Sequence, residues 1–209
     1  TPNVIVKKSL WNLKMNKKLK IDDLLSLEEY AKQRDDIREK VLNHKKNRKI
    51  NIGMHVLLLF EDKITIKYQI QEMLRIEKIF EQDGIKEELT TYNPLIPNGD
   101  NWKATMLIQY SDEDERKKAL ALLVGIENKV WVKVGDEDKI YAISDEDLDR
   151  TRSDKTSSVH FLRFQMNQSQ IGNIDHSRPI QFGIDHEHYS YNTGDIDEAV
   201  RTSLINDLD

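Results

Sequence analysis

The most regular pattern of apolar positions along the chain lies between Ile64 and Gln82. At 100° per residue these positions gather on one broad face of a helix, and they are Ile66, Ile70, Met73, Leu74, Ile76 and Phe80. The next two residues, Asp83 and Gly84, are typical of a helix end, because glycine accepts the left-handed conformation that often follows a last turn. The pattern therefore predicts one long amphipathic helix over 64–82.

Two shorter amphipathic helices are expected before it. The first begins either with an N-cap at Asp22 or Asp23, or with Ser26 and Glu29, which have the spacing of a capping box. The second is expected over about 35–47, where apolar residues recur on one side.

Strands are predicted in most of the remaining chain. The nearly continuous apolar run Val56–Phe60 indicates a strand buried on both faces, and residues 102–110 alternate as a half-buried strand does. Further strands are expected in VWVKV and KIYAIS, which are predicted to form a hairpin with a polar turn. Two more are expected in SSVHFLRFQM and in PIQFGIDH. A helix capped by Ser111 follows the strand over 102–110, and a short acidic helix is expected near 195–208.

This order of elements favours an α+β fold with a single domain. The N-terminal helices and the long amphipathic helix are expected to pack on a mostly antiparallel sheet. Residues 1–14 are unpatterned and basic, so we interpret them as a disordered or non-native lead-in, with translation beginning at Met15. Residues 15–191 then form the domain, and residues 192–209 form a C-terminal tail that carries the short helix.

Composition narrows the classes of protein. The chain has 209 residues and no cysteine, which excludes disulfides, thiolate nucleophiles and an iron–sulfur cluster held by this chain's own sulfur. Residues 1–49 carry 14 Lys and Arg against 7 Asp and Glu, and residues 50–209 carry 18 against 30, which together give the net charge of −5. No apolar run approaches the roughly 18 residues of a membrane helix, so we expect a cytoplasmic protein with no membrane partner.

Glu77 is a candidate for chemistry because the long helix places it in the middle of its apolar stripe. A buried carboxylate must be neutralised, paired or ligated, so Glu77 is a candidate general base, metal ligand or member of an ion pair. The alternative is a rotated or frayed helix that leaves Glu77 at its boundary, beside Lys78 or Lys63.

The strand SSVHFLRFQM carries a polar residue on each face. Alternation puts His160 on one face and Arg163 on the other, so whichever face is inside needs a polar partner. Both residues are therefore candidate catalytic groups together with Glu77. A core histidine held by a backbone carbonyl is the structural alternative.

Two sets of histidines are candidate ligands of a transition metal. His55, Glu77 and His160 have the residue types of a His/His/carboxylate site, if the fold brings them together. A weaker set is His186 and His188, which a strand would point to the same face.

The basic run that closes the second helix is a candidate phosphate or ligand site, formed by Lys45, Lys46 and Arg48. Cations at a helix C-terminus also have a purely structural use. The acidic remainder of the chain and the lack of interleaved aromatic residues make nucleic acid an unlikely partner.

Five segments together resemble a bacterial family known only as domain of unknown function 3501. They are HKKNRKINIGMHVLLLFED (44–62), YQIQEMLRIEKIF (68–80), YNPLIPNGDNWKATMLIQY (92–110), KTSSVHFLRF (155–164) and GIDHEHY (183–189). The resemblance implies a setting in redox or oxidative-stress metabolism, as a companion of rubrerythrin-like proteins and iron–sulfur oxidoreductase subunits. It brings no active site with it, and any iron–sulfur cluster would belong to the partner.

Three functions therefore remain open. The first is an accessory protein of such a redox system that binds a partner or a small ligand. The second is a metal-dependent enzyme that uses His55, Glu77 and His160. The third is a phosphate-ligand or RNA-binding module centred on Lys45, Lys46 and Arg48. The chain has none of the common nucleotide-binding or hydrolase motifs to decide among them.

Overall fold

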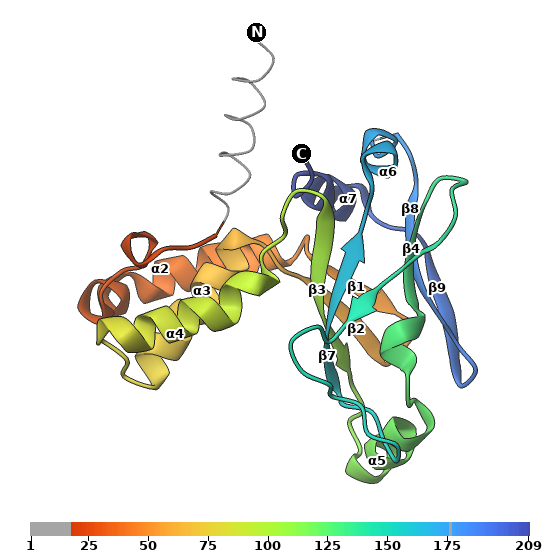
Figure 1. The fold of residues 1–209 in the computed structure, drawn as a ribbon, viewed down its shortest axis with the longest axis horizontal. Helices are drawn as coiled ribbons and strands as arrows, with labels where there is room; N and C mark the ends of the chain where they lie inside the picture. Colours follow the sequence, from red (N-terminus) through yellow and green to blue (C-terminus); the bar gives the residue numbers. More distant parts are fainter. Residues whose placement is uncertain (1–17, 176) are drawn as a thin grey trace, which may run out of the picture. The chain divides into compact units, whose positions relative to one another are not determined.

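A computed structural model describes residues 18–175 and 177–209, and Figure 1 traces its elements. The residues expected as a lead-in, 1–14, and Met15 lie outside the described part. The chain divides into two compact units: unit 1 holds residues 18–46 and Glu61–Gly99, and unit 2 holds Asn47–Phe60 and Asp100–Asp209. Helices dominate the described part of unit 1 and antiparallel sheets dominate unit 2. The predicted α+β class is confirmed.

Unit 1 begins with one long helix where the sequence suggested two short ones. After the 3-10 turn η2 (Ile21–Asp23), helix α2 runs without a break from Leu27 to Lys45. Ser26 is its N-cap and forms the predicted capping box, since the Ser26 hydroxyl accepts from the Glu29 backbone and the Glu29 carboxylate accepts from the Ser26 backbone. The prediction of a separate second helix was wrong because no breaker interrupts the chain near Asp35.

The long helix predicted over 64–82 is two helices. Helix α3 covers Lys63–Ile76, helix α4 covers Gln82–Tyr92, and the 3-10 turn η3 (Asn93–Leu95) follows. Lys78 takes a left-handed φ of 56°, and the Ile79 amide donates back to the Leu74 carbonyl at 2.9 Å. These are features of a helix-ending turn, here without glycine. Gly84, expected as the stop, lies inside α4.

Helices α2 and α3 are joined by a cluster around Glu72. The Arg34 guanidinium donates two hydrogen bonds to the Glu72 carboxylate, at 2.8 and 2.9 Å, and the buried Tyr30 hydroxyl donates a third at 2.8 Å. Together with Arg75 these donors lower the pKa of Glu72 to about 2, Arg34 having the largest effect. Below this cluster Leu19, Ile66, Ile70, Leu74, Leu89 and Ile96 form the core of unit 1.

Unit 2 is built on two antiparallel sheets where the sequence suggested one. The first has the order β1-β2-β3-β7-β6, with β1 Lys49–Ile52, β2 Val56–Phe60, β3 Asn101–Ile108, β7 Val159–Gln165 and β6 Ile143–Ser144. The second has the order β5-β4-β8-β9, with β5 Ile140–Tyr141, β4 Val130–Val134, β8 Ile180–His186 and β9 Tyr189–Asp195. Its helical elements are α5 Glu113–Leu122, η4 Ile126–Lys129, α6 Gln168–Gly172 and α7 Glu198–Ile205.

The inner faces of the two sheets meet in one core. Phe182 of the four-stranded sheet packs edge-on against Phe60 and Phe164 of the five-stranded sheet, with ring centroids 5.2 and 5.5 Å apart. The predicted alternation holds in β3, where Trp102, Ala104, Met106 and Ile108 are buried.

The expected hairpin partner KIYAIS serves both sheets. Its first residues, β5, pair with β4, and its last residues, β6, pair with β7. The buried Ala142 lies between them and donates its amide to the Val130 carbonyl at 2.8 Å. The five-residue stretch 140–144 therefore passes from one sheet to the other.

The segment after Tyr191, set apart above as a tail, adds to the core of unit 2. Val200 and Leu204 of helix α7 are buried in that core. The Trp102 indole nitrogen donates to the Leu204 carbonyl at 2.7 Å. Among the described residues, no helix has the length and apolar character needed to cross a membrane.

Gly183 allows a close approach on the outer face of the four-stranded sheet. A Cβ at this position would lie 2.2 Å from Cζ2 of Trp131, the neighbour across the β4–β8 ladder. The indole ring therefore needs a residue without a side chain beneath it.

Candidate functional site

Several polar side chains of unit 2 lie around His160. This residue lies on β7, on the buried face with Leu162 and Phe164, and its side chain is fully enclosed. Its Nδ1 is 2.6 Å from Oδ2 of Asp145. Its Nε2 is 2.9 Å from the Thr156 hydroxyl and 3.1 Å from the Ser157 carbonyl oxygen. Both ring nitrogens therefore have hydrogen-bond partners within the protein.

Asp145 is held in an uncommon backbone conformation. Its φ is +47°, which a residue with a side chain adopts only when its surroundings enforce it. The Asp145 amide donates to the Phe161 carbonyl at 2.8 Å, and Oδ1 accepts from the Phe161 amide at 3.0 Å. Arg150 donates to the same oxygen at 3.3 Å. These contacts fix the carboxylate beside the imidazole.

Glu127 completes the cluster from the 3-10 helix η4. It is 4% exposed, and its Oε2 is 4.0 Å from Nε2 of His160. The Thr151 hydroxyl donates to its Oε1 at 3.0 Å and the Thr156 hydroxyl is 3.4 Å from its Oε2. We call Glu127, Asp145, Thr151, Thr156 and His160 the buried polar network.

This network has the hydrogen-bond order of a hydroxyl, a base and an orienting acid, as in nucleophilic triads. Thr156, however, is only 2% exposed, and its hydroxyl also lies 3.1 Å from that of Thr151. The two surface pockets described, one in each unit, are lined by other residues. The arrangement suits a satisfied internal network that ties residues 145–156 to β7.

Arg163 and His55 have partners of their own. Arg163 lies on the opposite face of β7, where its guanidinium donates twice to Glu146 at 2.7 Å and lowers the pKa of that carboxyl. His55 precedes β2, with Nδ1 3.0 Å from the Gln109 carbonyl oxygen and its ring stacked on Tyr110 at 3.9 Å. Neither side chain belongs to the buried polar network.

In unit 2, the predicted metal ligands His55 and His160 have separate partners, and the third predicted ligand, Glu77, belongs to unit 1. Glu77 is the C-cap of α3 and is exposed, because the helix ends there and does not carry it into an apolar stripe. Among the described residues no three or more His, Asp or Glu side chains are arranged to hold a metal ion. The prediction relied on a helix that continues to Gln82, whereas α3 ends at Ile76.

His186 and His188 are not a free chelating pair either. The His186 Nε2 lies 3.1 Å from the Val124 carbonyl oxygen, and its Nδ1 accepts from the His188 amide at 3.2 Å. The strand ends at His186, so His188 lies in the turn beyond the expected alternation. The two rings are tilted by 51° with centroids 5.9 Å apart.

The basic run does not present three free cations. Arg48 is 2% exposed, and its guanidinium donates to the Phe60 carbonyl at 3.1 Å and to the Asp207 carboxylate at 2.6 Å. Arg48 lies immediately before β1 with its side chain buried, so it is not a surface cation as the phosphate-site prediction assumed. Lys45 lies over the Tyr68 ring at 5.7 Å, and the exposed Lys46 donates to Asn43 at 2.8 Å.

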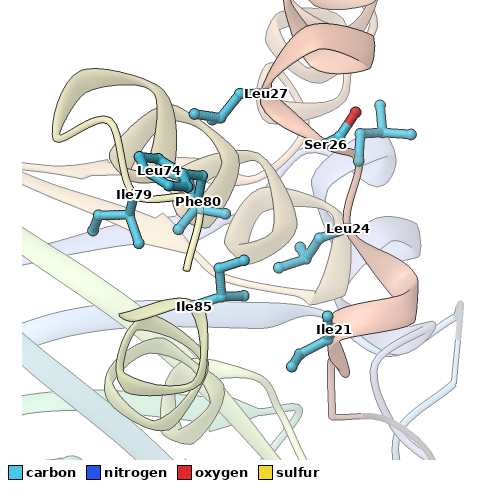
Figure 2. A pocket seen from close by; sticks show the side chains of 9 residues that line it. Ile21, Leu24, Ser26, Leu27, Leu74, Ile79, Phe80 and Ile85 are labelled. Atoms are coloured by element: carbon cyan, nitrogen blue, oxygen red, sulfur yellow. The ribbon is translucent and has the colours of Figure 1, made fainter. Parts of the chain in front are cut away.

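Unit 1 contains an apolar pocket that the sequence did not reveal. Its volume is about 210 Å³, and it is lined by Ile21, Leu24, Leu25, Ser26, Leu27, Leu74, Ile79, Phe80 and Ile85. Figure 2 shows Leu24, Phe80 and Ile85, from three different segments, turned toward the same hollow. None of the lining side chains is charged, and the Ser26 hydroxyl is already bonded to Glu29 at 2.9 Å.

Exposed apolar side chains continue this surface. Phe80 is 73% exposed and Ile76 is 55% exposed, both at the break between α3 and α4. Exposed large apolar groups beside an apolar hollow are typical of an interaction site. The sequence missed the pocket because an unbroken helix over 64–82 would have placed Phe80 on the core face.

Comparisons with known proteins show the family to which the chain belongs. Residues 18–208 match the family described as Protein of unknown function (DUF3501). The chain belongs to this family. A crystal structure described as a novel protein of unknown function from Burkholderia pseudomallei K96243 is 50% identical to it, with a TM-score of 0.87. The match covers 92% of this chain and 100% of that one. No curated protein matches.

Membership of the DUF3501 family confirms the resemblance seen in the five sequence segments. It agrees with the fold, because the Burkholderia structure has the same architecture over nearly the whole chain. The family description assigns no role to any residue.

Proposed function

We propose that this DUF3501 protein is an accessory protein that binds a partner through the apolar pocket of unit 1. The observation that carries the proposal is the pocket itself, with Phe80 largely exposed at its edge. Exposing a phenyl ring to water costs free energy that contact with an apolar partner recovers, at about 25 cal/mol per Å². A binding surface explains this exposure.

The chemistry of the two units supports binding over catalysis. The apolar pocket has no charged lining residue that could act as an acid, a base or a metal ligand. The titratable side chains His160, Asp145 and Glu127 are enclosed, and each is hydrogen-bonded within the buried polar network. A reaction centre needs such groups to reach a substrate.

The size of the pocket favours a side chain over a cofactor. Ligand pockets usually measure about 300–1,000 Å³, while an apolar cavity of about 150 Å³ holds one benzene ring. The volume of about 210 Å³ falls between these values. It matches a single bulky apolar group presented by a partner protein.

The partner we propose is a rubrerythrin-like protein or an iron–sulfur oxidoreductase subunit, in a redox or oxidative-stress system. This setting is supported by the family resemblance, which implies that members act beside rubrerythrin-like proteins and iron–sulfur oxidoreductase subunits. Since the chain has no cysteine, such a partner would bring the cluster or the di-iron centre.

Calorimetry with purified proteins from one organism tests the proposal. The protein is titrated against each of the two redox partners, and then Phe80→Ser is compared with Leu148→Ser. Leu148 is a matched control because it is 65% exposed but lies in unit 2. We expect Phe80→Ser to weaken binding about tenfold, as loss of an interface anchor does, and Leu148→Ser to leave it unchanged.

Two results would count against the proposal. Absence of binding to either redox partner would remove the redox setting. Binding that Phe80→Ser and Leu148→Ser leave equally intact would show that the apolar pocket is not the contact surface.

A further inference from the structure

The charges around the apolar pocket identify the kind of segment that it binds. Apart from Leu74 of α3, the lining residues fall within two stretches of chain, residues 20–29 and 76–88. These stretches contain nine acidic residues, namely Asp22, Asp23, Glu28, Glu29, Glu77, Glu81, Asp83, Glu87 and Glu88, and three basic ones, namely Lys20, Lys78 and Lys86. Their net charge is therefore 3 − 9 = −6.

Part of this charge is already compensated. Lys32 pairs with Glu28 at 2.8 Å and Lys63 with Asp23 at 3.8 Å, both from outside the two stretches. Including these two cations still leaves an excess of four negative charges. Among the described residues, Glu77, Glu81, Glu87 and Glu88 form no ion pair. Glu77 and Glu81 flank the break between α3 and α4 that carries Phe80, and Glu87 and Glu88 lie in α4. We call these four residues the acidic rim.

Three members of the acidic rim, Glu77, Glu87 and Glu88, are close enough for Glu88 to be repelled by the other two. The pKa of Glu88 is raised, first by partial burial and then by the negative charges of Glu77 and Glu87. A cation placed between these carboxylates would relieve both the repulsion and the unfavourable burial of charge. Like charges around an apolar surface also discourage contact with acidic partners.

We propose that the apolar pocket, together with the acidic rim, binds a basic amphipathic segment of a partner protein. One bulky apolar side chain of that segment enters the pocket beside Phe80, and flanking Lys or Arg side chains face the rim. The inference rests on the proposed function and adds the chemistry of the partner. The apolar contact provides an anchor, while the charges select and orient the segment.

Designed peptides test this directly on the full chain. Three peptides of about 16 residues share one sequence: the first has a central Phe flanked by four Lys, the second replaces the Lys by Glu, and the third replaces the Phe by Ser. Fluorescence anisotropy measures their binding at low and high salt. We expect the Lys–Phe peptide to bind at least about tenfold more tightly than either of the others at low salt, and this advantage over the Glu peptide to shrink at about 0.5 M salt.

Protein variants separate the two contributions. Glu77→Gln combined with Glu81→Gln and Glu88→Gln should weaken the Lys–Phe peptide about tenfold or more and leave the Glu peptide no weaker. A triple variant of exposed acids in α5, Glu113→Gln with Asp114→Asn and Glu115→Gln, is the matched control and should change binding little. Circular dichroism checks that each variant is folded.

Three outcomes would overturn the inference. Equal binding of the Lys and Glu peptides would remove the role of charge, and equal binding of the Phe and Ser peptides would remove the apolar anchor. No binding of any peptide, while a redox partner still binds in a Phe80-dependent way, would reject the basic segment but keep the proposed function.

Discussion

The cluster around Glu72 gives a quantitative prediction for the variant Glu72→Gln. The substitution keeps the size of the side chain and an oxygen that can accept from Tyr30, but it removes the charge that Arg34 and Arg75 contact. We expect a loss of stability, because the two guanidinium groups lose their common carboxylate.

The magnitude follows from the shift of the Glu72 pKa. A fall from 4.5 in the unfolded chain to about 2 in the folded protein is about 2.5 units and sets an upper limit of about 3.4 kcal/mol. The Arg34 and Arg75 side chains are 30% and 39% exposed, so water and salt screen the interaction. Discounting about half for screening leaves a loss of about 1.5–2 kcal/mol at neutral pH.

The sign of the pH dependence is fixed by the direction of the shift. Because the folded pKa lies below the unfolded one, the stabilisation is complete above about pH 4.5 and is lost as the pH falls toward about 2. The difference between wild type and Glu72→Gln should therefore shrink to less than about half of its neutral value by about pH 3.

Urea unfolding followed by circular dichroism, at several values between pH 7 and pH 3, measures this difference. Glu28→Gln is a suitable control, since its carboxylate is 79% exposed and forms a surface pair that contributes little. A difference for Glu72→Gln that stays constant over the whole range would refute the reasoning, because it would show that the charge of Glu72 is not what stabilises the helix pair.

Three further predictions concern unit 2, and thermal or urea unfolding measures each of them. Gly183→Ala should lower the free energy of unfolding by about 1–3 kcal/mol, because the added methyl group overlaps the indole ring of Trp131. Gly172→Ala, with open space around it, should change stability by less than about 1 kcal/mol. Equal effects of the two substitutions would contradict the close approach of Trp131 to Gly183. His160→Ala should cost about 3 kcal/mol or more, because it leaves a cavity and an enclosed carboxylate without its partner; a loss below about 1 kcal/mol would show that the network is not sealed. Arg48→Met should cost about 3–5 kcal/mol by leaving Asp207 without its buried cation, and a neutral effect would mean that this carboxylate reaches water freely.

The sequence predicted features that depend on neighbouring residues. Ser26 and Glu29 are three positions apart, and the capping box forms as expected. The alternation in β3 and β7 correctly put Trp102 and Lys103 on opposite faces, and likewise His160 and Arg163. Spacing along one element decides these features, so periodicity is enough to find them.

The break after α3 was missed for a physical reason. Lys78 adopts a positive φ, which sequence patterns associate with glycine or asparagine. The apolar residues Ile76 and Phe80 continued the helical period well enough to hide the break. The apolar pocket and the acidic rim both depend on that turn, so the candidate site could not be predicted.

The partners of His160 were missed because they come from elsewhere in the chain. Asp145 lies in the highly charged stretch SDEDLDRTRSDK (144–155), whose composition is typical of a solvated connector. Its inward turn depends on contacts with Phe161. Glu127 did leave a signal, since it is an acidic residue between the apolar Ile126 and Val130. Which carboxylate meets which histidine is decided by tertiary packing, on which local spacing carries no information.

The division of the chain has a consequence for folding kinetics. Strands β2 and β3 are direct neighbours, with Phe60 opposite Ala104, yet the 61–99 stretch of unit 1 is inserted between them. Pairing them from an unstructured chain means closing a loop of about 39 residues, which costs roughly 3 kcal/mol of chain entropy. Helices α3 and α4 shorten that loop when they form, so variants that weaken the helices of unit 1 should also slow the assembly of the five-stranded sheet.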